Sequence, residues 1–206
     1  MEEVLDTYAQ PYDPACPVLC MDEQPVQLLK ETRTPIPATA AHGKRVDYEY
    51  ERAGVANIFM FTEPLAGWRQ VSVRESKTKA DWALEMAQLL EGRYAACETV
   101  IVVCDNLNTH TKGAFYEVFA PERARRLVRR LVFRHTPKHG SWLNAAEIEL
   151  SLLTRQCLRR RIPDLETLCA QVHAWQQTRN ASAKGVDWQF TTSDARIKLK
   201  KLYPQI

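Results

Sequence analysis

The chain alternates short runs of apolar, mostly β-branched residues with longer stretches in which apolar residues recur every three or four positions. The short runs predict strands, at residues 18–21, 46–50, 56–61, 69–73, 100–104 and 131–135. The longer stretches predict helices, at residues 81–90, 113–119, 121–131, 144–161, 164–179 and 192–202. Gly54 is expected to form a turn between two strands.

The order of these elements predicts an α/β fold with a mixed five-stranded sheet and helices on both of its faces. The closely spaced strands before residue 81 are expected to supply three antiparallel strands of this sheet. After these strands, helices alternate with the strands at 100–104 and 131–135, as in crossover units. This order is the ribonuclease H-like plan, in which the strands at 18–21 and 100–104 are neighbours.

Both of these neighbouring strands run into acidic residues. The strand at 18–21 is followed by Asp22 and Glu23, and the strand at 100–104 is followed by Asp105. Open α/β sheets bind their ligands beyond the carboxyl ends of the strands. We therefore expect Asp22 and Asp105 to lie side by side at a binding edge.

A third acid, Glu147, is predicted to point inward from the helix at 144–161. Apolar or small residues flank it at helical spacing, which places it on the same face as Leu143 and Leu150. An inward carboxylate is costly unless something pairs with it. A divalent cation shared with an inward acid at a strand end would be such a partner.

Each acid also has a purely structural interpretation. Asp105 could form an Asx turn or a helix cap after its strand. Glu147 could close a capping box with Asn144. A register shift of one residue would turn Glu23 inward instead of Asp22. The occurrence of all three acids in this order favours a site.

Positive charge is concentrated around Glu147, although the net charge of the chain is only +3. Residues 121–161 hold 11 basic and 3 acidic side chains, whereas residues 1–120 have a net charge of −7. This clustering favours a polyanionic substrate over solvated helix faces. The candidate contacts are Arg125, Arg126, Arg129, Arg130, Lys138 and His139, although two of the four arginines are expected to be merely solvated.

Other classes of protein are disfavoured by composition. No stretch approaches the ~18 apolar residues of a membrane span. The acidic N-terminus lacks a signal region, so we expect a cytoplasmic protein. The six cysteines lack paired metal-ligand spacing, which favours reduced, buried thiols over a zinc site.

Three motifs make this chain resemble the DDE transposases of the IS630 branch, which is related to the Tc1/mariner group. They are Met21–Glu23, Val102–His110 and Thr136–Glu147, and the likeness extends over about residues 17–205. The resemblance implies a catalytic triad of Asp22, Asp105 and Glu147. It also implies that this triad binds two Mg²⁺ or Mn²⁺ ions per active site, since hard divalent cations prefer carboxylate oxygens.

The same resemblance implies a function in transposition. The enzyme would hydrolyse a phosphodiester at the transposon end and then join the freed 3′-OH to target DNA. Its partners would be transposon-end and target DNA, with a dimer formed on the DNA at the nucleoid. Full-length relatives carry N-terminal helix-turn-helix modules, and none precedes Asp22 here. We therefore expect a separate or missing end-binding module.

Within this scheme, residues 1–16 are an N-terminal segment and linker, and residues 17–180 are the catalytic domain. Residues 181–206 are a basic C-terminal tail with a short helix. Around the acids, Asn106, Asn108 and His110 are expected to support the metal ligands from behind. Trp142 is expected to be a core anchor.

Two rival functions remain open. One is a related ribonuclease H-like nuclease that cuts DNA but does not join it. The other is a non-catalytic DNA-binding or assembly remnant of a transposase, whose DNA binding would survive loss of all three carboxylates.

Overall fold

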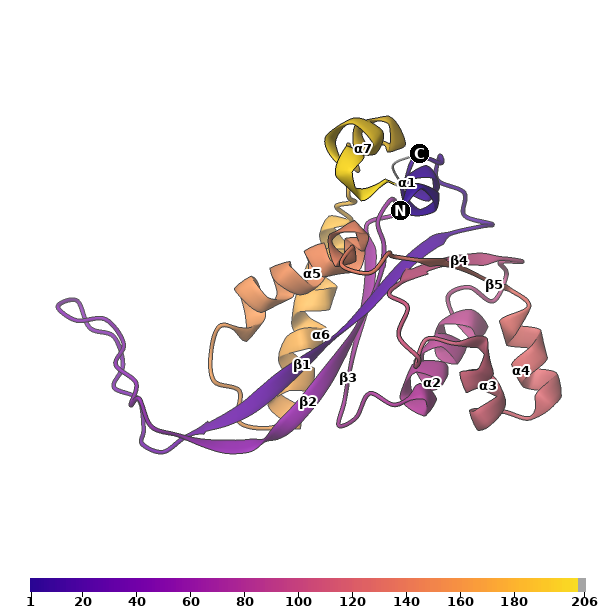
Figure 1. Ribbon diagram of the computed structural model, residues 1–206. Helices are drawn as coiled ribbons and strands as arrows, with labels where there is room; N and C mark the ends of the chain where they lie inside the picture. The colour runs from indigo at the N-terminus through magenta and orange to yellow at the C-terminus, as the bar shows by residue number, and fades with distance from the viewer. Residues whose placement is uncertain (204–206) are drawn as a thin grey trace.

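A mixed five-stranded sheet, ordered β3-β2-β1-β4-β5, forms the centre of the computed structural model, which describes residues 1–203 (Figure 1). β1 pairs antiparallel with β2, and β2 with β3, whereas β1, β4 and β5 are parallel. This confirms the predicted sheet. The strands are β1 Val18–Glu31, β2 Tyr50–Glu63, β3 Trp68–Arg74, β4 Val100–Cys104 and β5 Leu131–His135.

Helices cover both faces of the sheet, as predicted (Figure 1). Helices α2, α3 and α4 pack on one face, and α5 and α6 on the other. No helix among the described residues has the length and apolar character needed to cross a membrane. The α-helices are α1 Glu2–Tyr8, α2 Lys79–Glu91, α3 Lys112–Val118, α4 Pro121–Val128, α5 Ala145–Leu153, α6 Leu165–Ser182 and α7 Thr192–Lys198.

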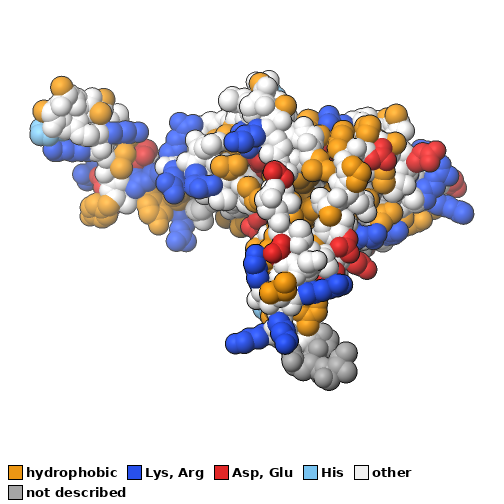
Figure 2. Space-filling model, turned by 90° about the horizontal axis from the view of Figure 1, so that it is seen from above, with side chains coloured by type: hydrophobic (Ala, Val, Ile, Leu, Met, Phe, Trp, Pro, Cys, Tyr) orange, Lys and Arg blue, Asp and Glu red, His pale blue; other side chains and the backbone are white. Residues whose placement is uncertain are grey.

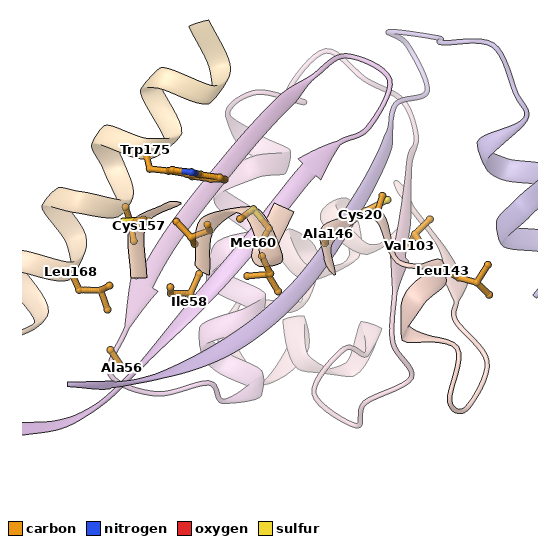
Figure 3. Close-up of a cluster of buried hydrophobic side chains, with 14 of the residues drawn as sticks. Cys20, Ala56, Ile58, Met60, Val103, Leu143, Ala146, Cys157, Leu168 and Trp175 are labelled. Atoms are coloured by element: carbon orange, nitrogen blue, oxygen red, sulfur yellow. The ribbon is translucent and has the colours of Figure 1, made fainter. Parts of the chain in front are cut away.

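Each face of the sheet has its own hydrophobic core, because successive strand residues point to opposite sides. Cys20 belongs to the core under α5 and α6, together with Met60 and Trp175 (Figure 3). The next residue, Met21, belongs to the core under α2 and α3. Strand β4 is buried along its whole length, as its apolar sequence predicts.

The hairpin of β1 and β2 differs from the prediction. β1 does not end before Asp22 but continues to Glu31 as the antiparallel partner of β2. Gly54 is not a turn: it lies inside β2 at φ +106°, where the register with β1 shifts between Gln27 and Leu29. A bulge of this kind uses the positive φ that glycine adopts without strain.

Residues 32–49 form an arm that joins β1 to β2 and projects from the body of the molecule (Figures 1 and 2). No strand forms at 46–49, so the strand predicted at 46–50 is wrong. Arg161 holds the base of the arm by donating to the backbone oxygens of Asp47, Tyr48 and Glu49.

The helix predicted at 144–161 ends earlier than expected. It stops after the π-helical turn Thr154–Leu158, so Arg161 lies beyond its last residue.

The sequence did not predict α1, because seven residues with two acids in the first turn give little helical signal. Its Val4, Leu5 and Tyr8 are nevertheless buried in the core under α5 and α6. The Tyr8 hydroxyl donates to the carbonyl of Leu143 and accepts from the backbone N–H of Ala145. The N-terminal segment therefore packs directly against the start of α5.

Candidate active site

Asp22 and Asp105 lie at the same edge of the sheet. The last parallel pair between β1 and β4 is Cys20 with Val103, and each acid lies two residues beyond its member of that pair. Asp22 therefore comes just after the parallel pairing ends, although β1 itself continues. Asp105 lies in the loop that follows β4, with 37% of its side chain exposed.

Helix α5 brings Glu147 to this edge. Asn144 caps the helix by accepting from the backbone N–H of Ala146, and its amide donates to the carbonyl of Met21 at 2.8 Å. The start of α5 is therefore bonded to the residue that precedes Asp22. Glu147 is half-buried, and it does not close a capping box with Asn144.

Hydrogen bonds also hold the C-terminal end of α5 against β1. The Gln24 amide donates to the Thr154 hydroxyl at 3.0 Å, and the same hydroxyl lies 3.2 Å from the Gln24 amide oxygen, to which it can donate. Strand alternation puts Gln24 on the same face of β1 as Asp22. The contact between Asp22 and Glu147 therefore lies between two polar bridges, one at Asn144 and one at Thr154.

The electrostatics of Asp22 show that the three acids converge. Its pKa is raised to about 7, first because the carboxyl is buried and then because Glu147 and Asp105 are close to it. The backbone N–H of Glu23, which donates to Asp22 at 2.8 Å, opposes this rise. A carboxyl that resists ionisation beside two like charges is a place where a cation is stabilised.

This shift predicts that Asp22→Asn stabilises the protein at alkaline pH. The unfolded carboxyl ionises near pH 4 and the folded one near pH 7, so rising pH lowers the stability of the wild type across that interval. The variant lacks this loss. We expect its free energy of unfolding to exceed that of wild type by about 1–3 kcal/mol at pH 8. At pH 4 the difference should be much smaller, as measured by urea denaturation. A variant less stable than wild type at pH 8 would contradict the shift.

His110 connects Asp105 to β1. Its Nδ1 lies 2.7 Å from Asp105 Oδ1, and its Nε2 lies 3.0 Å from Glu23 Oε1. The first contact is a close ion pair that is poorly aligned for a hydrogen bond. Burial alone would lower the pKa of His110, but contacts with Asp105, Cys104 and Glu23 raise it to about 11. The pKa of Asp105 is lowered, because its contact with His110 outweighs the effect of burial.

The structural alternatives for the acids are only partly realised. The backbone N–H of Leu107 lies 3.4 Å from Asp105 Oδ1, a long contact for an Asx turn. Asp22 and Glu23 both point inward, but to opposite faces of the sheet, since their cross-strand partners Met60 and Phe59 belong to different cores.

The donor set suits a hard divalent cation, since it consists of three carboxylates at one edge. Among residues 1–203, however, no three His, Cys, Asp or Glu side chains already form a group that could hold a metal ion. The carboxylates thus approach one another without closing into a finished cage.

Other candidate residues are placed differently. Asn106 and Asn108 are exposed, and neither side chain has a hydrogen-bond partner among the described residues. Lys138 and His139 are exposed in the loop after β5, at the same edge as the acids. Trp142 is not a core anchor: it is 46% exposed and touches Phe190 edge-on.

The arginines of α4 and of the turn after it lie away from the acids, near the opposite edge of the sheet, where β4 and β5 begin. Arg126, Arg129 and Arg130 line an open hollow of about 780 Å³ there. Arg130 donates to the backbone oxygens of Leu90, Tyr94 and Cys97. Because its guanidinium is used inside the fold, we no longer expect Arg130 to contact DNA. Arg125 is exposed on α4.

The sequence did not predict a buried ion-pair cluster that holds α5 in place. Arg69 of β3 lies 2.7 Å from Glu149 of α5, and both side chains are 1% exposed. Arg179 of α6 binds the same carboxylate at 2.9 Å. Glu149 follows Glu147 by two residues, so it points away from the acid edge and fixes α5 to β3 and α6. Only the apolar neighbours of Glu149 hinted at its burial.

The fold and the acid-lined edge define this chain as a ribonuclease H-like α/β protein with a candidate carboxylate site. Residues 17–169 match a family model described as DDE superfamily endonuclease. The chain belongs to this family. Among curated proteins, no sequence match was found.

Solved structures of similar fold include complexes of the Mos1 transposase. The Mos1 mariner paired end complex with Mn has a TM-score of 0.55 at 14% identity, covering 86% of this chain and 52% of that one. The Mos1 strand transfer complex has a TM-score of 0.57 at 11% identity, covering 91% and 60%. The pre-cleavage Mos1 transpososome has a TM-score of 0.56 at 12% identity, covering 91% and 61%. The chain thus spans about half to three fifths of these structures' length, and the likeness concerns the fold.

Proposed function

We propose that this chain is the catalytic domain of a DDE transposase that cuts DNA and joins the cut end to a target. The observation that carries the proposal is the placement of Asp22, Asp105 and Glu147 at one sheet edge, where Glu147 and Asp105 add to the effect of burial in raising the pKa of Asp22. Membership of the DDE superfamily endonucleases supports DNA as the substrate. The fold shared with Mos1 complexes named for paired ends and strand transfer supports transposition.

In this proposal, Asp22, Asp105 and Glu147 hold two Mg²⁺ or Mn²⁺ ions. Bound there, the ions would activate the attacking water or 3′-OH and stabilise the leaving oxygen of an in-line displacement. The chain itself supplies the arrangement: Asn144 and the Gln24–Thr154 pair fix α5 against β1, and His110 contacts one oxygen of Asp105. No covalent enzyme intermediate is needed, so no nucleophilic side chain has to be found.

Finer parts of the proposal concern the element and its assembly. We propose membership of the IS630 branch, a dimer on DNA, a separate or missing end-binding module, and a cytoplasmic location at the nucleoid. All four proposals follow from the family resemblance of the three motifs. The Mos1 paired-end complexes are consistent with the proposed dimer. The proposed catalytic domain is residues 17–180, preceded by an N-terminal segment at 1–16 and followed by a tail at 181–206, of which residues 204–206 lie outside the described part of the chain.

A combined cleavage and joining assay tests the function. The chain would be incubated with Mn²⁺, a labelled duplex carrying the element's end and a supercoiled target plasmid. The proposal expects both cut ends and joined products. Cut ends without joined products would favour the related nuclease, and DNA binding without either product would favour the non-catalytic remnant.

We also propose where DNA binds. Lys77 is exposed just before α2 and lies close enough to Asp105 to help lower the pKa of that carboxyl. Lys138 lies in the loop after β5. Neither lysine has an ion-pair partner among the described residues. We therefore expect DNA to cross this edge of the sheet.

The expected result is that Lys77→Glu or Lys138→Glu weakens duplex binding about tenfold at low salt and flattens the salt dependence. Arg129→Glu is the matched control, since it makes the same charge change at the opposite edge, beside the hollow near the start of β4. Fluorescence anisotropy titrations at several salt concentrations would measure the duplex affinity of each variant and its salt dependence. An Arg129→Glu loss as large as the lysine losses would place DNA at the opposite edge.

A further inference from the structure

The side chain of Glu23 is buried behind the acid edge. It is 4% exposed, and strand alternation turns it to the face of α2 and α3, away from Asp22. An isolated carboxylate in such a position is costly and requires a partner. Its contact is Nε2 of His110 at 3.0 Å.

His110 is itself enclosed. Its side chain is 1% exposed, and its ring lies 5.6 Å from that of Trp82 on α2, tilted by 38°. Trp82 also packs against Phe115 and Phe133, so the aromatic cluster fixes the plane of the imidazole. With the plane fixed, Nε2 lies 3.0 Å from the Glu23 carboxylate and Nδ1 lies 2.7 Å from the Asp105 carboxylate.

The Asp105 carboxylate is held asymmetrically as a result. Its Oδ1 carries the 2.7 Å contact with His110 and the long contact with the Leu107 N–H. Its Oδ2 has no partner among the described residues. A carboxylate with one oxygen fixed from behind and the other left open is oriented to bind a ligand with the open oxygen.

We propose that Glu23 and His110 are positioning residues that set the orientation of Asp105 relative to Asp22. Asp22 and Glu23 are consecutive residues of β1, so the Glu23–His110–Asp105 contacts tie the loop after β4 to the strand that carries the other acid. This inference rests on the proposed metal site. It assigns Glu23, which the sequence pattern offered only as an alternative to Asp22, a separate role on the other face of the sheet.

The positioning role differs from a purely structural one in what it predicts for metal binding. Supporting groups behind metal ligands typically change metal affinity about 10–100-fold when they are removed. If Glu23 and His110 only stabilised the core, their replacement would lower the melting temperature and leave metal affinity unchanged. Metal affinity and thermal stability must therefore be measured on the same variants.

The test is a calorimetric Mn²⁺ titration of the full chain with a duplex oligonucleotide present, accompanied by thermal denaturation. Glu23→Gln is expected to weaken Mn²⁺ binding at least about tenfold. Glu63→Gln is the matched control: Glu63 is also buried, but it pairs with Arg93 and Tyr94. We expect Glu63→Gln to lose stability while its Mn²⁺ affinity changes less than about twofold.

A second pair of variants covers the case in which Glu23→Gln fails to fold. In His110→Asn the amide can replace Nδ1 facing Asp105, whereas in His110→Gln it can replace Nε2 facing Glu23. The proposal expects His110→Asn to retain more Mn²⁺ affinity than His110→Gln. Equal affinities for these two variants would overturn it.

Asp105→Asn separates this proposal from the function on which it rests. If Asp105→Asn loses Mn²⁺ binding while Glu23→Gln stays within about twofold of wild type, the positioning role is overturned and the metal site stands. If Asp105→Asn binds Mn²⁺ as wild type does, the metal site itself is overturned.

Discussion

Replacing Glu147 by Gln is expected to abolish metal-dependent DNA cleavage, with a loss of at least about 10³-fold in rate. Glutamine is close to glutamate in size and keeps the helix position, but it removes the negative charge that a hard divalent cation requires. Since Asn144 and not Glu147 caps α5, the substitution should leave the helix intact. Single-turnover cleavage of a labelled duplex would measure the loss.

Glu166→Gln supplies the control for this experiment. Glu166 lies in the first turn of α6, as Glu147 lies in that of α5, but its side chain is exposed. We expect its cleavage rate to remain within about twofold of wild type. A Glu147→Gln variant that still cuts DNA at a comparable rate would mean that Glu147 is not part of the catalytic centre.

The largest effect on stability is expected for Glu149→Gln. This change leaves the buried guanidinium of Arg69 without its carboxylate partner and weakens the hold of Arg179 on α5. Breaking a buried ion pair by removing one partner costs about 3–5 kcal/mol. That is a large part of the roughly 5–15 kcal/mol that stabilises a typical domain. Urea denaturation followed by circular dichroism would measure it.

Two comparisons show whether the cost comes from the unpaired charge. Glu91→Gln breaks the exposed ion pair with Arg123 and should cost less than about 1 kcal/mol. The double change Arg69→Met with Glu149→Met removes both charges and should recover much of the stability lost in Glu149→Gln. A double variant as unstable as the single one would indicate that packing, and not charge, explains the loss.

Sequence reasoning located the elements whose patterns are strong. The apolar run of β4 and the Asp164 cap of α6 agree with the structure. The helix predicted at 192–202 begins at Thr192 as expected, but α7 ends at Lys198 and a short 3-10 turn follows at Lys200–Leu202. The five-stranded sheet also follows, because the order of short connections and crossover helices restricts the topology. The placement of Asp22, Asp105 and Glu147 near one another was predicted from the same order.

The features that the sequence did not predict depend on contacts between distant parts of the chain. β1 continues past Asp22 because pairing with β2 satisfies its backbone, and a polar, half-exposed strand containing Pro25 has no strong sequence signal. Glu149 looks like any helical acid until its partner Arg69, which is 80 residues away in the chain, is placed beside it. The Glu23–His110 contact likewise spans 87 residues and depends on which face of β1 each acid occupies.

Asp22, Asp105 and Glu147 are proposed to hold divalent cations together. Crystals of the chain with a duplex oligonucleotide, soaked in Mn²⁺, would test it through the anomalous scattering of manganese. We predict anomalous peaks in contact with oxygens of all three carboxylates, and their loss in crystals of Asp105→Asn. Well-diffracting crystals with no peak at these carboxylates, or with manganese bound only elsewhere, would contradict the account.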